Sequence, residues 1–141
     1  MSKIPVGILG ATGMVGQMYI SLLRDHPWFE VAYTAASPRS AGKSYAQAVA
    51  GRWHAERDGK EGVWAEGAGA LIVEDANDVS KAAAANKQGR CAFVFSALET
   101  TKEEIRALEE KYAAAGIPVV SNASANRWAE DVPMLIAEVN P

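Results

Sequence analysis

The chain has 141 residues, the size of one ordinary domain, which is enough to bury a core but short for a two-domain enzyme. Its 49% of hydrophobic and 22% of charged residues are typical of a folded globular protein, and the net charge of −3 argues against a nucleic-acid binder. No apolar run reaches the ~20 residues of a membrane span, and one cysteine excludes an intrachain disulfide or a multi-cysteine metal site. The N-terminus lacks the long apolar core of a signal peptide, so we expect a soluble, cytoplasmic protein with no metal, nucleic-acid or membrane partner.

The first third of the chain predicts a strand, a helix and a second strand. Residues 4–9 are an apolar run of the kind that forms a strand buried on both faces. A helix follows the glycine turn after this strand and ends before Pro27, and residues 30–36 predict the second strand. The apolar stripe of the helix is expected to comprise Val15, Met18, Tyr19, Leu22 and Leu23.

The middle of the chain is less regular. Residues 50–69 are rich in glycine and charge and contain Trp53 and Trp64, which we expect to be packing or loop anchors. This stretch predicts an excursion with a short helix or hairpin. Further strands are predicted over 71–73, 91–95, 117–120 and 134–136, and an alanine-rich helix over 79–85.

A well-marked helix begins after Thr100 and Thr101, which precede Glu103 and Glu104 at the spacing of a capping box. Gly116 stands where a glycine would end this helix. The buried stripe of the helix is expected to comprise Ile105, Leu108 and Tyr112.

Strands therefore alternate with helices along the whole chain. This alternation requires right-handed crossovers and a parallel sheet. The sequence predicts an α/β fold with a Rossmann-type, doubly wound and mostly parallel sheet, in a single domain over residues 1–141.

The turn between the first strand and the first helix carries Gly10, Gly13 and Gly16. Dinucleotide-binding folds use glycines here for a tight turn, for close approach of backbone N–H groups to a pyrophosphate, and for close packing of the helix. The helix N-terminus adds unpaired N–H donors and a partial positive charge. The spacing is GxxGxxG rather than GxGxxG, so a packing requirement alone is the alternative. The position of the turn, after the first strand and before a helix, favours a nucleotide site.

The end of the second predicted strand indicates which nucleotide binds. An NAD-specific site places a carboxylate there, whereas this chain has Ser37, Arg39, Ser40 and Lys43 and no acidic residue. Two hydroxyls, a guanidinium and an ammonium group suit a 2′-phosphate dianion. We therefore expect NADP(H) as the cofactor, and the alternative is an ordinary polar turn.

Ser96, Ala97 and Leu98 follow residues 91–95 at the edge of the sheet where ligands bind in open α/β folds. Their small side chains would let the chain pass beside a nicotinamide. A strand-to-helix turn without a ligand is the alternative.

No residue has convincing catalytic surroundings in the sequence. Cys91 begins an apolar strand at the end opposite the expected cleft, which favours a small buried side chain over a nucleophile. His26 and His54 are isolated and lack metal-ligand spacing. No tyrosine is followed four positions later by lysine, which argues against a short-chain dehydrogenase.

Four segments together resemble the aspartate-semialdehyde dehydrogenase family in its archaeal and fungal branch. They are residues 7–16 (GILGATGMVG), 36–43 (ASPRSAGK), 121–127 (SNASANR) and 132–140 (VPMLIAEVN). The resemblance implies an oxidoreductase on the pathway to lysine, threonine, methionine and isoleucine. In that family NADPH reduces aspartyl phosphate to aspartate semialdehyde and phosphate, with a cysteine thiolate as nucleophile and a histidine as acid–base.

The resemblance also implies roles for individual residues. The pyrophosphate turn is matched by Thr12, Gly13, Met14 and Val15. The 2′-phosphate site is matched by Ser37, Arg39 and Ser40, and positions near the nicotinamide are matched by Ser96, Ala97, Leu98 and Asn122. Arg127 matches the arginine that holds the phosphate of the substrate. The alternative for Arg127 is a surface arginine paired with Glu130 or Asp131.

The family's catalytic domain is absent from this chain, because its nucleophilic cysteine motif and its histidine lie beyond Asn140. The chain is therefore expected to bind nucleotide without turnover. The family's carboxy-terminal helix packs onto this domain, so the chain is expected to expose an apolar face and self-associate, and the parent protein to be a homo-oligomer. Two alternatives remain. One is N-acetyl-glutamyl-phosphate reductase, which shares the GATG opening, and the other is a stand-alone NADP-sensing protein.

Overall fold

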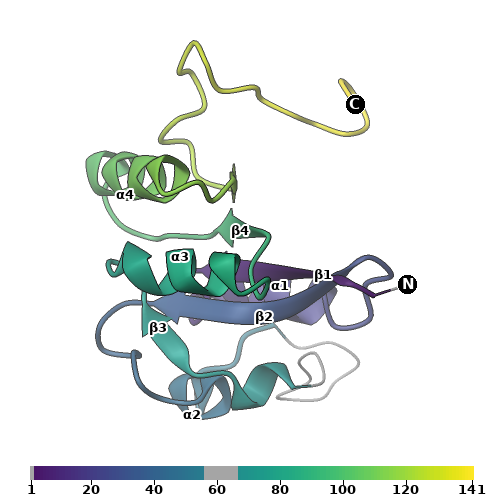
Figure 1. The fold of residues 1–141 in the computed structure, drawn as a ribbon, viewed down its shortest axis with the longest axis vertical. Helices are drawn as coiled ribbons and strands as arrows, with labels where there is room; N and C mark the ends of the chain where they lie inside the picture. The colour runs from purple at the N-terminus through teal and green to yellow at the C-terminus, as the bar shows by residue number, and fades with distance from the viewer. Residues whose placement is uncertain (1, 56–66) are drawn as a thin grey trace.

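The computed structural model describes residues 2–55 and 67–141, which fold around one parallel β-sheet (Figure 1). Five strands in this part of the chain pair in the order β3-β2-β1-β4-β5, and every neighbouring pair is parallel. They are β1 (Ile4–Leu9), β2 (Phe29–Ala36), β3 (Val73–Asp75), β4 (Phe93–Ser96) and β5 (Val119–Ser121). The strand order reverses between β1 and β4, as in a doubly wound sheet, so the predicted Rossmann-type fold is confirmed.

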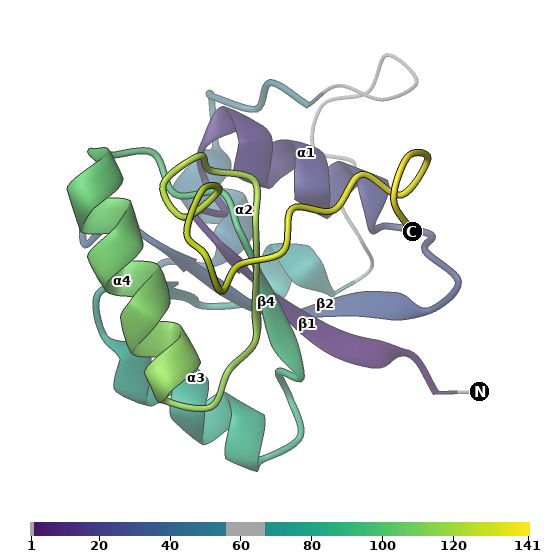
Figure 2. The same ribbon diagram turned by 90° about the horizontal axis from the view of Figure 1, so that it is seen from above.

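Helices cover both faces of the sheet. On one side lie α1 (Met14–Leu22), the short α2 (Tyr45–Val49) and the 3-10 turn η1 (Ala68–Ala70). On the other side lie α3 (Val79–Lys87) and α4 (Lys102–Ala114) (Figure 2). Each side buries its own apolar cluster, and successive residues of β1 point to opposite clusters, Ile8 to the first and Leu9 to the second.

The buried face of α1 agrees with the predicted stripe only in part. Tyr19 and Leu23 pack in the core as predicted, but Met18 and Leu22 are 47% and 59% exposed. The fully buried residues of the helix are Gly16, Gln17, Ile20 and Ser21. The reason is Gly16, where a Cβ atom would lie 2.1 Å from the carbonyl oxygen of Gly10. This backbone contact fixes the rotation of the helix, so the residues one turn after Gly16 point inward whatever their polarity.

Gln17 shows how a polar residue is accommodated on that inner face. Its Nε2 donates hydrogen bonds to the carbonyl oxygens of Thr12 and Arg52, both at 3.0 Å, and its Oε1 accepts one from the backbone N–H of His54 at 2.7 Å. Gln17 therefore joins the glycine turn to the segment after α2. The hydrogen bonds offset the cost of burying its amide.

The helix predicted after Thr101 is confirmed as α4. The Thr101 side chain accepts a hydrogen bond from the backbone N–H of Glu104, whose carboxylate accepts one from the backbone N–H of Thr101. Gly116, at φ +82°, follows the helix as predicted. Ile105 and Tyr112 are buried as expected, but Glu109 is also buried on the same face, which the sequence did not indicate.

Other boundaries depart from the sequence pattern. Residues 134–136 are not a strand but lie in an exposed terminal segment, because they have no neighbouring strand to pair with. The helix α2 was not predicted, although Ser44 and Gln47 form a capping box at its start. Of the excursion over 50–69, residues 56–66, including Trp64, lie outside the described residues. Within the described ranges, no helix is long and apolar enough to cross a membrane.

Candidate functional site

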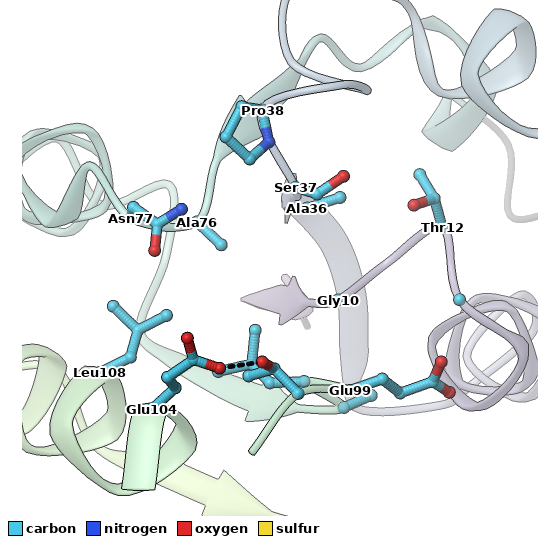
Figure 3. Close-up of a pocket in the computed structure, with 14 residues that line it drawn as sticks. Gly10, Thr12, Ala36, Ser37, Pro38, Ala76, Asn77, Glu99, Glu104 and Leu108 are labelled. Carbon is cyan, nitrogen blue, oxygen red and sulfur yellow. Dashed lines mark hydrogen bonds between the residues drawn. The ribbon is translucent and has the colours of Figure 1, made fainter.

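A cavity of about 460 Å³ lies at the carboxyl ends of the strands, where the strand order reverses (Figure 3). This is the edge at which open α/β sheets bind ligands. The cavity is lined by Gly10, Thr12, Gly13, Ala36, Ser37, Pro38, Ala76, Asn77, Ala97, Leu98, Glu99, Thr100, Glu104 and Leu108. Six of these residues belong to the site that the sequence predicts, namely Gly10, Thr12, Gly13, Ser37, Ala97 and Leu98.

The three glycines of the turn are not equally constrained by their surroundings. Gly10 has φ +72°, and a Cβ atom there would lie 2.3 Å from the carbonyl oxygen of Ala97. Gly16 allows the backbone of α1 to pack directly against the backbone of Gly10. Gly13 has an ordinary φ of −77°, and a Cβ atom there would meet only the carboxyl group of Glu99, at 3.3 Å. Only Gly10 and Gly16 are therefore required by the backbone geometry itself.

The N-terminus of α1 opens at the cavity. Gly13 is its N-cap residue and provides no side-chain hydrogen bond, and the first turn contains no acidic residue. The backbone N–H groups of the first turn and the positive end of the helix dipole can attract an anion, and the carboxyl group of Glu99 lies next to Gly13 at this end. Met14 is 63% exposed and neither it nor Val15 lines the cavity, so their contribution to binding would come through the backbone.

The loop after β2 brings hydroxyl and cationic groups to the same edge. Ser37 lines the cavity, whereas Arg39 and Lys43 are exposed and lie outside its lining. Within the described part of the chain, neither cation forms an ion pair. Ser40 is buried, and its Oγ accepts a hydrogen bond from Nη2 of Arg52 at 3.3 Å, so it holds the loop rather than facing the cavity.

The loop after β4 forms the opposite wall. Ser96 is fully buried, and its Oγ has no hydrogen-bond partner among the described residues. Ala97 and Leu98 line the cavity, with the backbone of Ala97 against Gly10. Asn122 does not line the cavity. Its backbone N–H donates to the carbonyl oxygen of Ser96 at 3.0 Å, which places Asn122 beside the end of β4 at the same edge of the sheet.

Arg127 also lies outside the cavity lining, with an exposed side chain. In the described residues it forms no ion pair with Glu130 or Asp131, which was the alternative reading of this arginine. Its backbone N–H donates to the carbonyl oxygen of Ser124 at 3.3 Å.

Sequence reasoning missed part of the cavity wall. Two acidic residues, Glu99 and Glu104, line the cavity together with Asn77, and its described lining contains no basic side chain. Hydrogen bonds from Thr100 and then Thr101 hold the pKa of the Glu104 carboxyl below its ordinary range. These residues follow β3 and β4, so their position at the carboxyl edge of the sheet was the available signal.

Cys91 is not part of the site. It precedes β4 at the end of the sheet opposite the cavity and is fully buried. Burial raises the pKa of its thiol to about 11, so it is protonated at neutral pH, and its Sγ donates to the carbonyl oxygen of Phe93 at 3.5 Å. The described residues contain no group of three His, Cys, Asp or Glu side chains that could hold a metal ion.

The fold, the glycine turn and the open helix N-terminus define a dinucleotide-binding α/β domain. Residues 5–141 match the family described as "Semialdehyde dehydrogenase, NAD binding domain", and the chain belongs to this family.

Several relatives carry a more specific name. The aspartate-semialdehyde dehydrogenase of Archaeoglobus fulgidus is 43% identical over 99% of this chain and 36% of its own length. That of Saccharomyces cerevisiae is 39% identical over 96% of this chain and 33% of its own length. Malonyl CoA reductase (NADP) of Metallosphaera sedula is 34% identical over 98% of this chain and 34% of its own length. The chain thus spans about a third of the length of the relatives it matches.

Solved structures agree with this result. Aspartate semialdehyde dehydrogenase with NADP from Candida albicans superposes at a TM-score of 0.74, with 34% identity over 95% of this chain and 33% of that one. Aspartate semialdehyde dehydrogenase II from Vibrio cholerae, at a TM-score of 0.61 and 24% identity, supports the fold alone.

Proposed function

We propose that this chain is the cofactor-binding part of an NADP(H)-dependent aspartate-semialdehyde dehydrogenase. The reaction converts aspartyl phosphate, NADPH and a proton into aspartate semialdehyde, NADP⁺ and inorganic phosphate. The observation that carries the proposal is the glycine turn at the open N-terminus of α1, next to a β2 loop that has two exposed cations and no carboxylate. The relatives named above supply the substrate class.

The residues present fit such a cofactor. The close contacts of Gly10 and Gly16 leave the turn free of side chains where a pyrophosphate would approach the N–H groups of Thr12, Met14 and Val15. The N–H of Gly13 already donates to the carbonyl oxygen of Gly10 at 3.1 Å, so Gly13 would contribute by the absence of a side chain. Bound NADPH would supply the hydride, and the residues of this chain would bind and orient the cofactor.

The 2′-phosphate would be held by Ser37, Arg39 and Lys43, for which a rotation of the exposed side chains is sufficient. Ser40 would join them only if it left its contact with Arg52. The nicotinamide half would lie along Ser96, Ala97, Leu98 and Asn122. Ser96 is fully buried and does not line the cavity, so its contribution would come through the position of the backbone that leads to Ala97.

The substrate phosphate is assigned to Arg127, because a guanidinium fork suits a dianion and this arginine has no carboxylate partner in the described structure. The only cysteine of the chain is buried away from the cleft, so the chain by itself is expected to bind nucleotide without turnover. A homo-oligomeric parent protein belongs to the same proposal.

Malonyl-CoA reduction is the second candidate, because a relative of that name matches almost the whole chain. Both reactions reduce an activated carboxyl group, and they differ in the leaving group, which is phosphate in one and a thiol in the other. Full-length protein assayed with aspartyl phosphate, N-acetyl-glutamyl phosphate and malonyl-CoA would separate the candidates. Turnover of malonyl-CoA alone would overturn the proposed substrate, and absence of all three activities would favour a nucleotide sensor.

The cofactor assignment is tested on the chain itself. Calorimetric titration is expected to show tighter binding of NADP(H) than of NAD(H), because only the former brings a 2′-phosphate to the cations of the β2 loop. Equal affinity for the two nucleotides would contradict the assignment.

A further inference from the structure

The strongest feature that the nucleotide site leaves unexplained is a buried carboxylate on α4. Glu109 is 4% exposed and lies on the core-facing side of the helix, between Ile105 and Tyr112. A carboxylate in such a position is costly unless its oxygens are hydrogen-bonded. Both are: Oε1 accepts from Oγ of Ser121 at 2.5 Å, and Oε2 accepts from Nδ2 of Asn126 at 2.9 Å.

Arg106, three residues earlier on α4, holds the same segment. Its Nη2 and Nε donate to the carbonyl oxygen of Ala125, at 2.7 and 3.3 Å. Glu109 and Arg106 of α4 therefore bind the same stretch of chain, which begins at Ser121, the last residue of β5. We name residues 121–126 the clamped loop.

The clamped loop is fixed at its beginning as well. The backbone N–H of Asn122 donates to the carbonyl oxygen of Ser96 on β4, and that of Ala123 donates to Oγ of Ser121 at 3.1 Å. Ser121 thus accepts from the loop and donates to Glu109, which joins the loop to the helix in one hydrogen-bond chain. The next residue after the clamped loop is Arg127.

We propose that Glu109, assisted by Arg106, is a positioning residue that fixes the clamped loop so that Arg127 meets the phosphate of the substrate. The inference rests on the proposed function, to which the role of Arg127 belongs. An apolar side chain at position 109 would pack beside Ile105 and Tyr112 without the cost of burying a charge. With a carboxylate at this position, the clamped loop is instead held by hydrogen bonds, which have preferred distances and angles and so fix its position.

The test is a double-mutant cycle in the full-length protein, assayed in the direction that consumes aldehyde, NADP⁺ and inorganic phosphate. Glu109→Ala is expected to raise the KM for phosphate about 10-fold, since a displacement of about 1 Å is enough for such a loss. The Kd of NADP(H) should change little, because Asn122 keeps its own backbone hydrogen bond to Ser96 on β4. Because Glu109 acts through Arg127, the double variant is expected to be no worse than Arg127→Ala alone.

Two further variants sharpen the result. Glu109→Gln keeps one acceptor oxygen, so its KM for phosphate is expected to lie between those of the unsubstituted protein and Glu109→Ala. If the negative charge alone mattered, Glu109→Gln and Glu109→Ala would have the same KM. Glu110→Gln, at the exposed neighbouring position, is the matched control and should leave the KM unchanged. If Glu109→Ala does not fold, Asn126→Ala removes one arm of the clamp and replaces it in the same cycle.

The outcomes distinguish a failure of the proposed substrate site from a failure of the positioning role of Glu109. If Arg127→Ala leaves the KM for phosphate unchanged, the substrate site under the proposed function is wrong, and the positioning role falls with it. If Arg127→Ala raises that KM but the two substitutions are additive, the positioning role alone is overturned. The same holds if Glu109→Ala lowers thermal stability without moving the KM.

Discussion

At the scale of single residues, the candidate site combines side chains that the fold needs with side chains that make no hydrogen bond or ion pair within the described residues. Gly10 and Gln17 are fixed by contacts within the turn and serve the fold with or without a nucleotide. Arg39 and Lys43 are exposed and contribute no ion pair in the described structure. Ser96 buries a hydroxyl without a partner. The second group is where substitutions should change binding more than stability.

Arg39→Ala is the sharpest substitution of this kind. Loss of one charge-assisted hydrogen-bond pair costs about 1.5–3 kcal/mol, so NADP(H) should bind roughly 10- to 150-fold more weakly, with little change for NAD(H). Isothermal titration of both nucleotides measures the difference. Arg90→Ala, an exposed arginine that precedes β4 at the opposite end of the sheet, is the control. A parallel loss of affinity for both nucleotides would show that Arg39 does not contact the 2′-phosphate.

At the scale of elements, the contact of Gly16 with the glycine turn limits how α1 can pack, in addition to its apolar residues. In Gly16→Ala, the new Cβ atom would lie 2.1 Å from the carbonyl oxygen of Gly10 and 2.8 Å from Cα of Ala11, so the helix must move away from the turn. The expected cost is about 1–3 kcal/mol of unfolding free energy, which exceeds the gain of about 1 kcal/mol in helix propensity. Urea denaturation measures it, and nucleotide affinity should fall with it.

Gly13→Ala is the matched control for that substitution. The added methyl group meets only the flexible end of Glu99, and φ is −77°, so the loss of stability should stay within about 1 kcal/mol. Equal destabilisation by the two substitutions would mean that the contact between Gly16 and Gly10 does not orient α1.

The elements also show what the sequence can and cannot predict. The strand β1 and the start of α4 were predictable, because an apolar run and a capping box are local signals. The inner face of α1 was predictable only in part, since the contact of Gly16 acts in addition to the apolar stripe, and residues 134–136 lack the partner that makes a strand. In the site, the glycine turn has a local signature. The wall formed by Asn77 and Glu99 depends on loops that meet only after folding.

At the scale of the whole molecule, the core contains four ionisable side chains that burial keeps in the protonated, uncharged state. Tyr33, Tyr45, Tyr112 and Cys91 are all buried, and burial raises the pKa of each, that of Cys91 to about 11. The hydroxyl of Tyr45 donates to the carbonyl oxygen of Ala11 at 2.9 Å, which ties α2 to the glycine turn. That of Tyr112 donates to the carbonyl oxygen of Ala76 at 2.8 Å, which ties α4 to the loop after β3.

Because burial disfavours ionisation of these four side chains, we expect the free energy of unfolding to fall at alkaline pH. A group whose pKa is raised in the folded state contributes stability that is fully present below its ordinary pKa and is lost as the pH rises through the folded value. For the Cys91 thiol the loss begins near pH 9 and continues to about pH 11, and it amounts to about 2–3 kcal/mol. The three tyrosines add to it above about pH 10.

Urea denaturation at pH 7.5, 9 and 10 measures this loss on the chain itself. Cys91→Ala separates the thiol from the phenols: it lowers stability at pH 7.5 by removing buried volume, but its free energy of unfolding should fall less steeply between pH 9 and 10 than that of the unsubstituted chain. The comparison uses the slope of the free energy of unfolding against pH, so the pH-independent loss of stability caused by the substitution does not affect it. A free energy of unfolding that stays level from pH 7.5 to pH 10 in the unsubstituted chain would contradict the burial of Cys91 and, with it, the packing of β4 between the two helical layers.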